Sequence, residues 1–219
     1  STMNAWETGQ WAISNTPAPM AATLITLAIM LKLGLAPVHA WYPEVLQGGT
    51  MTTALIISTW QKLAPLTLLY LMSNHLPLTI ALTLGLTSTL VGGWMGLNQT
   101  QTRKILAFSS IAHMGWMVTA LALNPNLALL TLTIYITMTT AIFMALNITM
   151  TKTITDMGTT WTQSPSLTAL AALTLMSLGG PPPLAGFTPK WLILNELCTL
   201  KLTPLATTLA LASLPSLYF

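Results

Sequence analysis

Four ionisable residues lie inside apolar segments of this sequence, where each could carry a proton. They are Lys32, Lys62, His113 and Lys190. A lysine at the centre of a membrane-spanning helix costs about 2.5–3.5 kcal/mol on insertion scales, so such charges usually face the protein interior and serve a function. Histidine titrates near neutral pH, which suits a proton relay. These residue types in apolar runs therefore indicate proton transfer across a membrane.

Lys62 is the most informative of the four because it lies near the middle of the apolar run 52–72. Pro65 follows in the same run and has no backbone N–H, so the carbonyl of Gln61 loses its usual helical partner. A cation, a side-chain amide and a free backbone acceptor are thereby predicted in one stretch, as in the lining of a hydrated cavity. The alternative is a structural lysine that pairs with a neighbouring helix.

The other three residues have simpler alternatives. Lys32 precedes Pro37 and could snorkel to the membrane interface. Lys190 follows the glycine- and proline-rich stretch 179–189, which is either a broken helix that handles ions or a loop outside the membrane. His113 lies in the middle of the run 104–123 and is either a relay or a packing residue. The residues alone leave these alternatives open.

The composition indicates that these residues lie in a membrane-embedded chain. Only 5% of the 219 residues are charged and 53% are hydrophobic, against about 25% charged in ordinary soluble domains. The net charge of +3 comes from scattered basic residues, which does not favour nucleic-acid binding. The single cysteine, Cys198, and the absence of metal-ligand spacings predict no metal and no cofactor bound by this chain.

The apolar runs predict an all-α polytopic membrane protein, with residues 1–219 forming part of a single membrane domain. A helix needs about 20 apolar residues to cross a bilayer, and the alternation that membrane β-barrels require is absent from the sequence. The expected transmembrane helices cover residues 18–37, 52–72, 77–97, 104–123, 127–150, 166–180, 187–200 and 204–219.

Basic residues in the connections predict how the bundle is oriented. Arg103 and Lys104 fall between the third and fourth expected helices, and Lys152 falls between the fifth and sixth. These connections lie on one side of the membrane, together with the connection 39–51. By the positive-inside rule, this side faces the negative compartment.

Four segments carry a resemblance to a known family. They are KLGLAPVHAWYPEV at 32–45, TWQKLAP at 59–65, NQTQTRKILAFSSIAHMGW at 98–116 and GGPPPLAGFTPKW at 179–191. Together they resemble the antiporter-like membrane subunits of mitochondrial respiratory complex I, NADH:ubiquinone oxidoreductase. The segments run from near the start of the chain into its last third and are highly specific in combination.

The resemblance implies a fold of inverted five-helix repeats, each with a discontinuous helix. Lys62 to Pro65 would be the first break, and residues 179–190 would be the second. Lys32, Lys62 and Lys190 would form the central row that transfers protons, with His113 as a possible relay. The protein would be a multi-pass protein of the mitochondrial inner membrane, with Arg103, Lys104 and Lys152 facing the matrix.

The function that the resemblance implies is that of a proton-translocating core membrane subunit. It would couple electron transfer from NADH to ubiquinone with proton pumping, and both substrates would react elsewhere in the complex. The implied partners are other membrane-arm subunits and the lipid bilayer, with no nucleic acid. The family pairs a lysine with an early glutamate, and no glutamate lies in the spans before Lys32. We therefore expect a fragment that lacks helices at both ends.

Two alternatives place the chain in other functional classes. A structural spacer would anchor neighbouring subunits, and its lysines would be inert packing charges. A free-standing cation/proton antiporter of the same ancestry would work without the complex.

Overall fold

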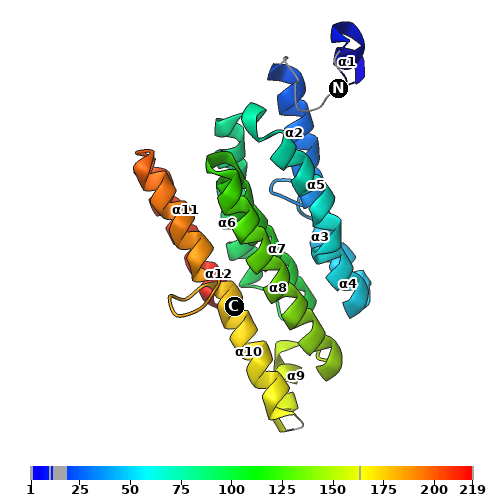
Figure 1. Cartoon of the computed structure of the whole chain (residues 1–219). Helices are drawn as coiled ribbons and strands as arrows, with labels where there is room; N and C mark the ends of the chain where they lie inside the picture. The colour runs from blue at the N-terminus through cyan, green and yellow to red at the C-terminus, as the bar shows by residue number, and fades with distance from the viewer. Residues whose placement is uncertain (1, 10, 12–18, 163, 219) are drawn as a thin grey trace.

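The computed structural model describes residues 2–9, 11, 19–162 and 164–218, which form helices joined by turns (Figure 1). Expected helix ends at residues 18 and 219 lie outside this part of the chain. In order, the helices are α1 (Thr2–Thr8), α2 (Pro19–Leu33), α3 (Trp41–Gly48), α4 (Met51–Ser58), α5 (Trp60–Leu71), α6 (Leu78–Gly96), α7 (Thr102–Leu123), α8 (Pro125–Thr149), α9 (Ile154–Thr159), α10 (Pro165–Gly179), α11 (Phe187–Thr199) and α12 (Thr203–Tyr218).

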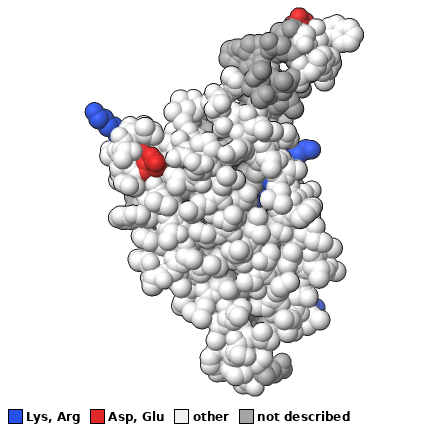
Figure 2. Space-filling model, in the orientation of Figure 1, with Lys and Arg blue, Asp and Glu red and all other residues white. Residues whose placement is uncertain are grey.

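Four of the helical stretches are long and apolar enough to cross a membrane: Met51–Leu71, Leu78–Gly96, Thr102–Leu123 and Pro125–Thr149. In lipid each backbone polar group must be satisfied within the segment, which favours helices. Threonine side chains are likewise satisfied within their own helix: the Thr119 hydroxyl donates to the carbonyl of Trp116 at 2.7 Å. Figure 2 shows few charged atoms on the face toward the viewer. The chain is a polytopic α-helical membrane protein, as the composition predicts.

The first span is discontinuous, and this corrects the expected helix 18–37. Helix α2 ends at Leu33, because Gly34 takes a left-handed conformation with φ of 77° and Pro37 cannot continue a helix. Residues expected to form a connection instead form α3, whose Tyr42 and Leu46 are buried. Figure 1 shows α3 continuing the path of α2 toward the opposite end of the bundle. A hydropathy rule tuned to about 20 residues does not detect such half-helices.

The break expected between Lys62 and Pro65 is also misplaced. Helix α5 runs through Pro65 without ending, and the interruption lies at Thr59, between α4 and α5. There the N–H of Lys62 donates to the carbonyl of Thr59 at 3.3 Å instead of to Ser58, its partner in a regular helix. Proline inside a transmembrane helix is tolerated where neighbouring groups satisfy the freed carbonyl.

The second discontinuous span joins α10 to α11. Helix α10 ends at Gly179 and Gly180 has φ of 87°, after which α11 begins at Phe187. Gly180 is buried and Lys190 is 8% exposed, so this stretch is a broken helix and not an external loop. In Figure 1 the chain runs upward through α10 and α11 but downward through α2 and α3. The two broken helices therefore cross the bundle in opposite directions, as inverted repeats require.

Helix α7 lies at the centre of the bundle and is buried over most of its length. It packs closely on α6 through Gly85, Gly92 and Gly115, and also contacts α8 and α11. Two groups of buried apolar side chains surround it, one toward each end of the bundle. A buried central helix can present a polar side chain to several neighbours at once.

Contacts between turns confirm that the two basic connections share one end of the bundle with the turn at Gly49. Arg103 donates a hydrogen bond to the carbonyl of Gly49, which follows α3. The N–H of Thr102 donates to the carbonyl of Lys152 at 3.1 Å. Lys201, in the turn between α11 and α12, lies at the other end. Three basic residues at one end and one at the other preserve the predicted asymmetry.

The reciprocal cap at the start of α9 predicts a local pH dependence. The N–H of Thr153 donates to the carboxylate of Asp156 at 2.9 Å, and the N–H of Asp156 donates to the Thr153 hydroxyl at 3.2 Å. Hydrogen bonds from Thr153 hold the pKa of the exposed Asp156 below its ordinary value. A lowered folded pKa gives stabilisation that is present above the unfolded pKa and is lost as pH falls through the folded pKa.

We therefore expect the Thr153–Asp156 amides to be better protected from hydrogen exchange in the wild type than in Asp156→Ala at neutral pH. Below the folded pKa of Asp156 the two proteins should exchange alike, after correction for intrinsic rates. A difference that persists undiminished in acid would contradict this role of the carboxylate.

Candidate functional site

Lys62 is buried in the interior of the bundle, 4% exposed, with aromatic groups around its ammonium. Its Nζ donates to the hydroxyl of Tyr135 at 3.2 Å. The same nitrogen lies 4.6 Å from the ring centroid of Tyr42 and 5.2 Å from that of Tyr135. The Tyr42 distance is within the range for a cation over an aromatic face, whereas Nζ approaches Tyr135 at its hydroxyl end. Three helices, α3, α5 and α8, therefore supply the surroundings of one ammonium group.

The interruption at Thr59 explains how Tyr135 is held. Because the Lys62 N–H bonds to Thr59, the carbonyl of Ser58 is free to accept from another donor. The Tyr135 hydroxyl donates to that carbonyl at 3.2 Å, which leaves its oxygen available to accept from Lys62. The backbone irregularity at Thr59 thus permits a chain of hydrogen bonds from Lys62 through Tyr135 to Ser58.

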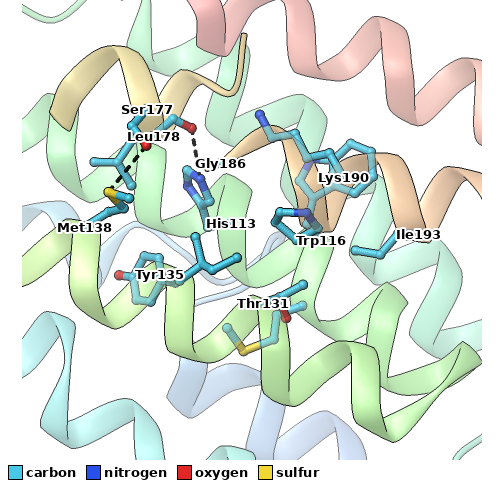
Figure 3. Close-up of a pocket in the computed structure, with 13 residues that line it drawn as sticks. His113, Trp116, Thr131, Tyr135, Met138, Ser177, Leu178, Gly186, Lys190 and Ile193 are labelled. Atoms are coloured by element: carbon cyan, nitrogen blue, oxygen red, sulfur yellow. Dashed lines mark hydrogen bonds between the residues drawn. The ribbon is translucent and has the colours of Figure 1, made fainter. Parts of the chain in front are cut away.

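His113, near the middle of α7, is held between two backbone carbonyls. Its Nδ1 lies 2.7 Å from the oxygen of Ser109. Its Nε2 lies 3.1 Å from the oxygen of Leu178 (Figure 3). Both partners are acceptors, and a neutral imidazole has only one N–H to donate. Both hydrogen bonds form together only when the ring carries two protons. A neutral ring therefore bonds only one of the two carbonyls at a time, so its proton can serve either side.

Lys190 lies in the first turn of α11, immediately after the second break. Its Nζ donates to the carbonyl of Gly179 at 2.6 Å. Gly179 is the last residue of α10, and a helix C-terminus with free carbonyls attracts a cation. The neighbouring carbonyl, that of Leu178, accepts from His113. Lys190 and His113 therefore bond consecutive carbonyls at the end of α10, which places the two side chains close together.

A small cavity joins these groups. Its volume is about 30 Å³, above the minimum of about 10–15 Å³ that a water molecule needs. In Figure 3, His113, Tyr135 and Lys190 lie around this space. The rings of His113 and Tyr135 are 5.7 Å apart between centroids. Tyr135 contacts Lys62 on one side and His113 on the other, so one row extends from Lys62 through Tyr135 and His113 to Lys190.

Other candidates from the sequence lie outside this row. Lys32 is the penultimate residue of α2 and is exposed on the described chain, unlike Lys62 and Lys190. The side chain of Gln61 is exposed, so it does not join Lys62. Among the residues that the structure describes, every acidic side chain is wholly or partly exposed: Glu7, Glu44, Asp156 and Glu196. The buried ammonium groups are therefore met by neutral acceptors.

Sequence reasoning missed two residues of the site, Tyr42 and Tyr135. Tyr135 lies inside the apolar helix α8, and a tyrosine there needs a hydrogen-bond partner for its hydroxyl. That requirement was a usable signal, although it does not name the partner. Tyr42 lies in a stretch assigned to a connection, so its burial on α3 had no sequence signal.

Two broken helices that run in opposite directions, with buried Lys190 beside one of them and buried Lys62 beside the interruption at Thr59, define an antiporter-like membrane bundle. A family model described as "NADH:quinone oxidoreductase/Mrp antiporter, TM" matches residues 4–214. The chain belongs to this family.

Curated relatives and solved structures agree with this family. NADH-ubiquinone oxidoreductase chain 2 of Xenopus laevis is 56% identical over 99% of this chain. That of Carassius auratus is 56% identical over the whole chain. The chain spans 63% of the length of each of these relatives.

Respiratory complex I from Thermus thermophilus contains a chain with a TM-score of 0.83 and 28% identity, over 91% of this chain and 47% of that one. The Mrp complex from Dietzia contains a chain with a TM-score of 0.88 and 18% identity, over 99% of this chain and 45% of that one, which shows the fold alone.

Proposed function

We propose that the chain is part of a proton-translocating membrane subunit of mitochondrial NADH:ubiquinone oxidoreductase. The observation that carries this proposal is the buried row from Lys62 through Tyr135 and His113 to Lys190. Its members come from four helices and meet at two interruptions of the helical backbone. A structural spacer, whose lysines only pack against neighbours, would not require a row of side chains with exchangeable protons along the interior.

In this proposal the row moves protons in response to charge elsewhere in the complex. Two like charges 4 Å apart interact by about 4 kcal/mol at an effective dielectric of 20, and by less at larger separations. Moving a positive charge toward Lys62 or Lys190 therefore favours release of a proton from that buried ammonium. His113 can take up a proton between its two carbonyls, and a water in the cavity can link it to Lys190.

The proposal includes the setting of the subunit. NADH and ubiquinone react elsewhere in the complex, and this chain carries no redox centre of its own. Arg103, Lys104 and Lys152 face the matrix side of the inner membrane. Lys32, exposed on the described chain, is covered by another membrane segment of the assembled complex, because a charge in a membrane span normally faces protein or water.

A hydrated high-resolution map of the assembled complex tests this function. We expect ordered water beside His113 and Lys190, in the cavity of about 30 Å³, and a continuous polar path from there to Lys62. Lys190 and His113, which line the cavity, supply hydrogen-bond partners for such water. A dry axis in a well-resolved map would favour the structural spacer. Active cation exchange by the isolated full-length subunit in liposomes would favour the free-standing antiporter.

A further inference from the structure

Tyr42 connects the first broken helix with the Lys62 ammonium. It belongs to α3, the half-helix that follows the break, and is 2% exposed. The face of its ring lies 4.6 Å from Lys62 Nζ. Its hydroxyl makes no hydrogen bond to Lys62. The contact that the fold provides for Lys62 is therefore the ring face and not the hydroxyl.

The base of the Tyr42 side chain lies against the end of α2. A Cβ atom added to Gly34 would lie 3.3 Å from Tyr42 Cβ and 3.4 Å from Tyr42 Cγ. Gly34 directly follows the last residue of α2, the helix that carries Lys32. One rigid side chain thus touches the backbone at the break and the buried ammonium. A shift of α3 relative to α2 must move the ring that Lys62 faces.

We propose that Tyr42 is a positioning residue that couples the geometry of the α2–α3 break to the Lys62 ammonium through its ring face. This inference rests on the proposed function, because it assigns Tyr42 a part in proton transfer by Lys62. A ring face attracts a cation electrostatically, and the attraction is stronger where water is excluded. Tyr135 contributes the hydrogen bond, so Tyr42 supplies the ring-face contact, and this contact depends on α3.

The test uses the full-length subunit in the assembled complex, reconstituted in liposomes. Proton pumping and NADH:ubiquinone electron transfer are measured per assembled complex. Tyr42→Met fills a similar volume without an aromatic face, and Tyr42→Phe keeps the ring. Tyr70→Met is the matched control, since Tyr70 lies on α5 with Lys62 but is 37% exposed.

We expect Tyr42→Met to lower proton pumping per electron about tenfold and Tyr42→Phe to stay within about twofold of wild type. The KM for ubiquinone should be unchanged in both variants, whereas a purely structural defect would lower the amount of assembled complex. Gly34→Ala, which pushes on Tyr42 and also strains the left-handed backbone at φ of 77°, should reduce coupling per assembled complex.

Normal pumping by Tyr42→Met would overturn the inference, and so would a loss in Tyr42→Phe as large as that in Tyr42→Met. If Tyr42→Met does not assemble, the nearly isosteric Tyr42→Phe still decides, because a tenfold loss there contradicts a role of the ring face. Lys62→Met is measured in parallel. If Lys62→Met fails to pump while Tyr42→Met pumps normally, the role of Tyr42 is contradicted but the proposed function is not.

Discussion

Lys62→Met should reduce proton pumping by the assembled complex roughly a hundredfold or more, the lower range for removing a positioned proton-transfer group. Methionine is similar in length and apolar, so it suits the interior between α3, α5 and α8 without a charge. Its side chain cannot hold a proton, and the Tyr135 hydroxyl loses the donor that lies 3.2 Å away. The row would then be interrupted at its first member.

Two further variants sharpen this test. Lys62→Arg keeps the positive charge but cannot release a proton in a protein, so we expect it to fail as well. Lys201→Met changes an exposed lysine in the turn after α11 and should pump normally. The measurement is the proton-to-electron ratio in liposomes, with the assembled complex quantified on native gels. A wild-type ratio in Lys62→Met would refute a required role for this lysine.

Gly186→Ala should strongly reduce both assembly and pumping. A Cβ atom at this position would collide with the backbone carbonyl of Ser177, so α10 or the start of α11 must shift. Overpacking of this kind typically costs about 1–3 kcal/mol, and more where backbone must move. The same shift would separate Lys190 from Gly179 and the Leu178 carbonyl from His113. Stability and proton transfer should therefore fall together.

Gly158→Ala is the matched control, since a Cβ atom on Gly158 in α9 would meet no atom within 4 Å. This variant should assemble and pump like the wild type. Thermal stability of the assembled complex and pumping per complex are the two measurements. If Gly186→Ala were as stable and as active as Gly158→Ala, the close packing at the second break could not be what positions Lys190.

Local composition was enough to predict that this chain is a helical membrane protein. Apolar runs indicate burial in lipid directly, because each residue of a spanning helix adds its own share to the free energy of transfer from water to the bilayer. The same local argument singled out Lys62 and His113, since an ionisable residue inside an apolar run is costly wherever its partners lie. The family resemblance followed from short motifs that need no tertiary information.

Only the tertiary structure decided where the helices break and what the buried groups contact. The first break lies after Leu33 and the smaller interruption lies at Thr59, because a left-handed glycine and a displaced hydrogen bond end helices whose composition is uniform. Tyr135 meets Lys62 across 73 positions of sequence, and His113 meets Leu178 across 65.

Such contacts depend on how α5, α7, α8 and α10 pack, and large apolar side chains occur on both the buried and the exposed faces of α5 and α8. Hydropathy therefore predicts that a residue is in the membrane, whereas packing alone determines which residue lies beside it.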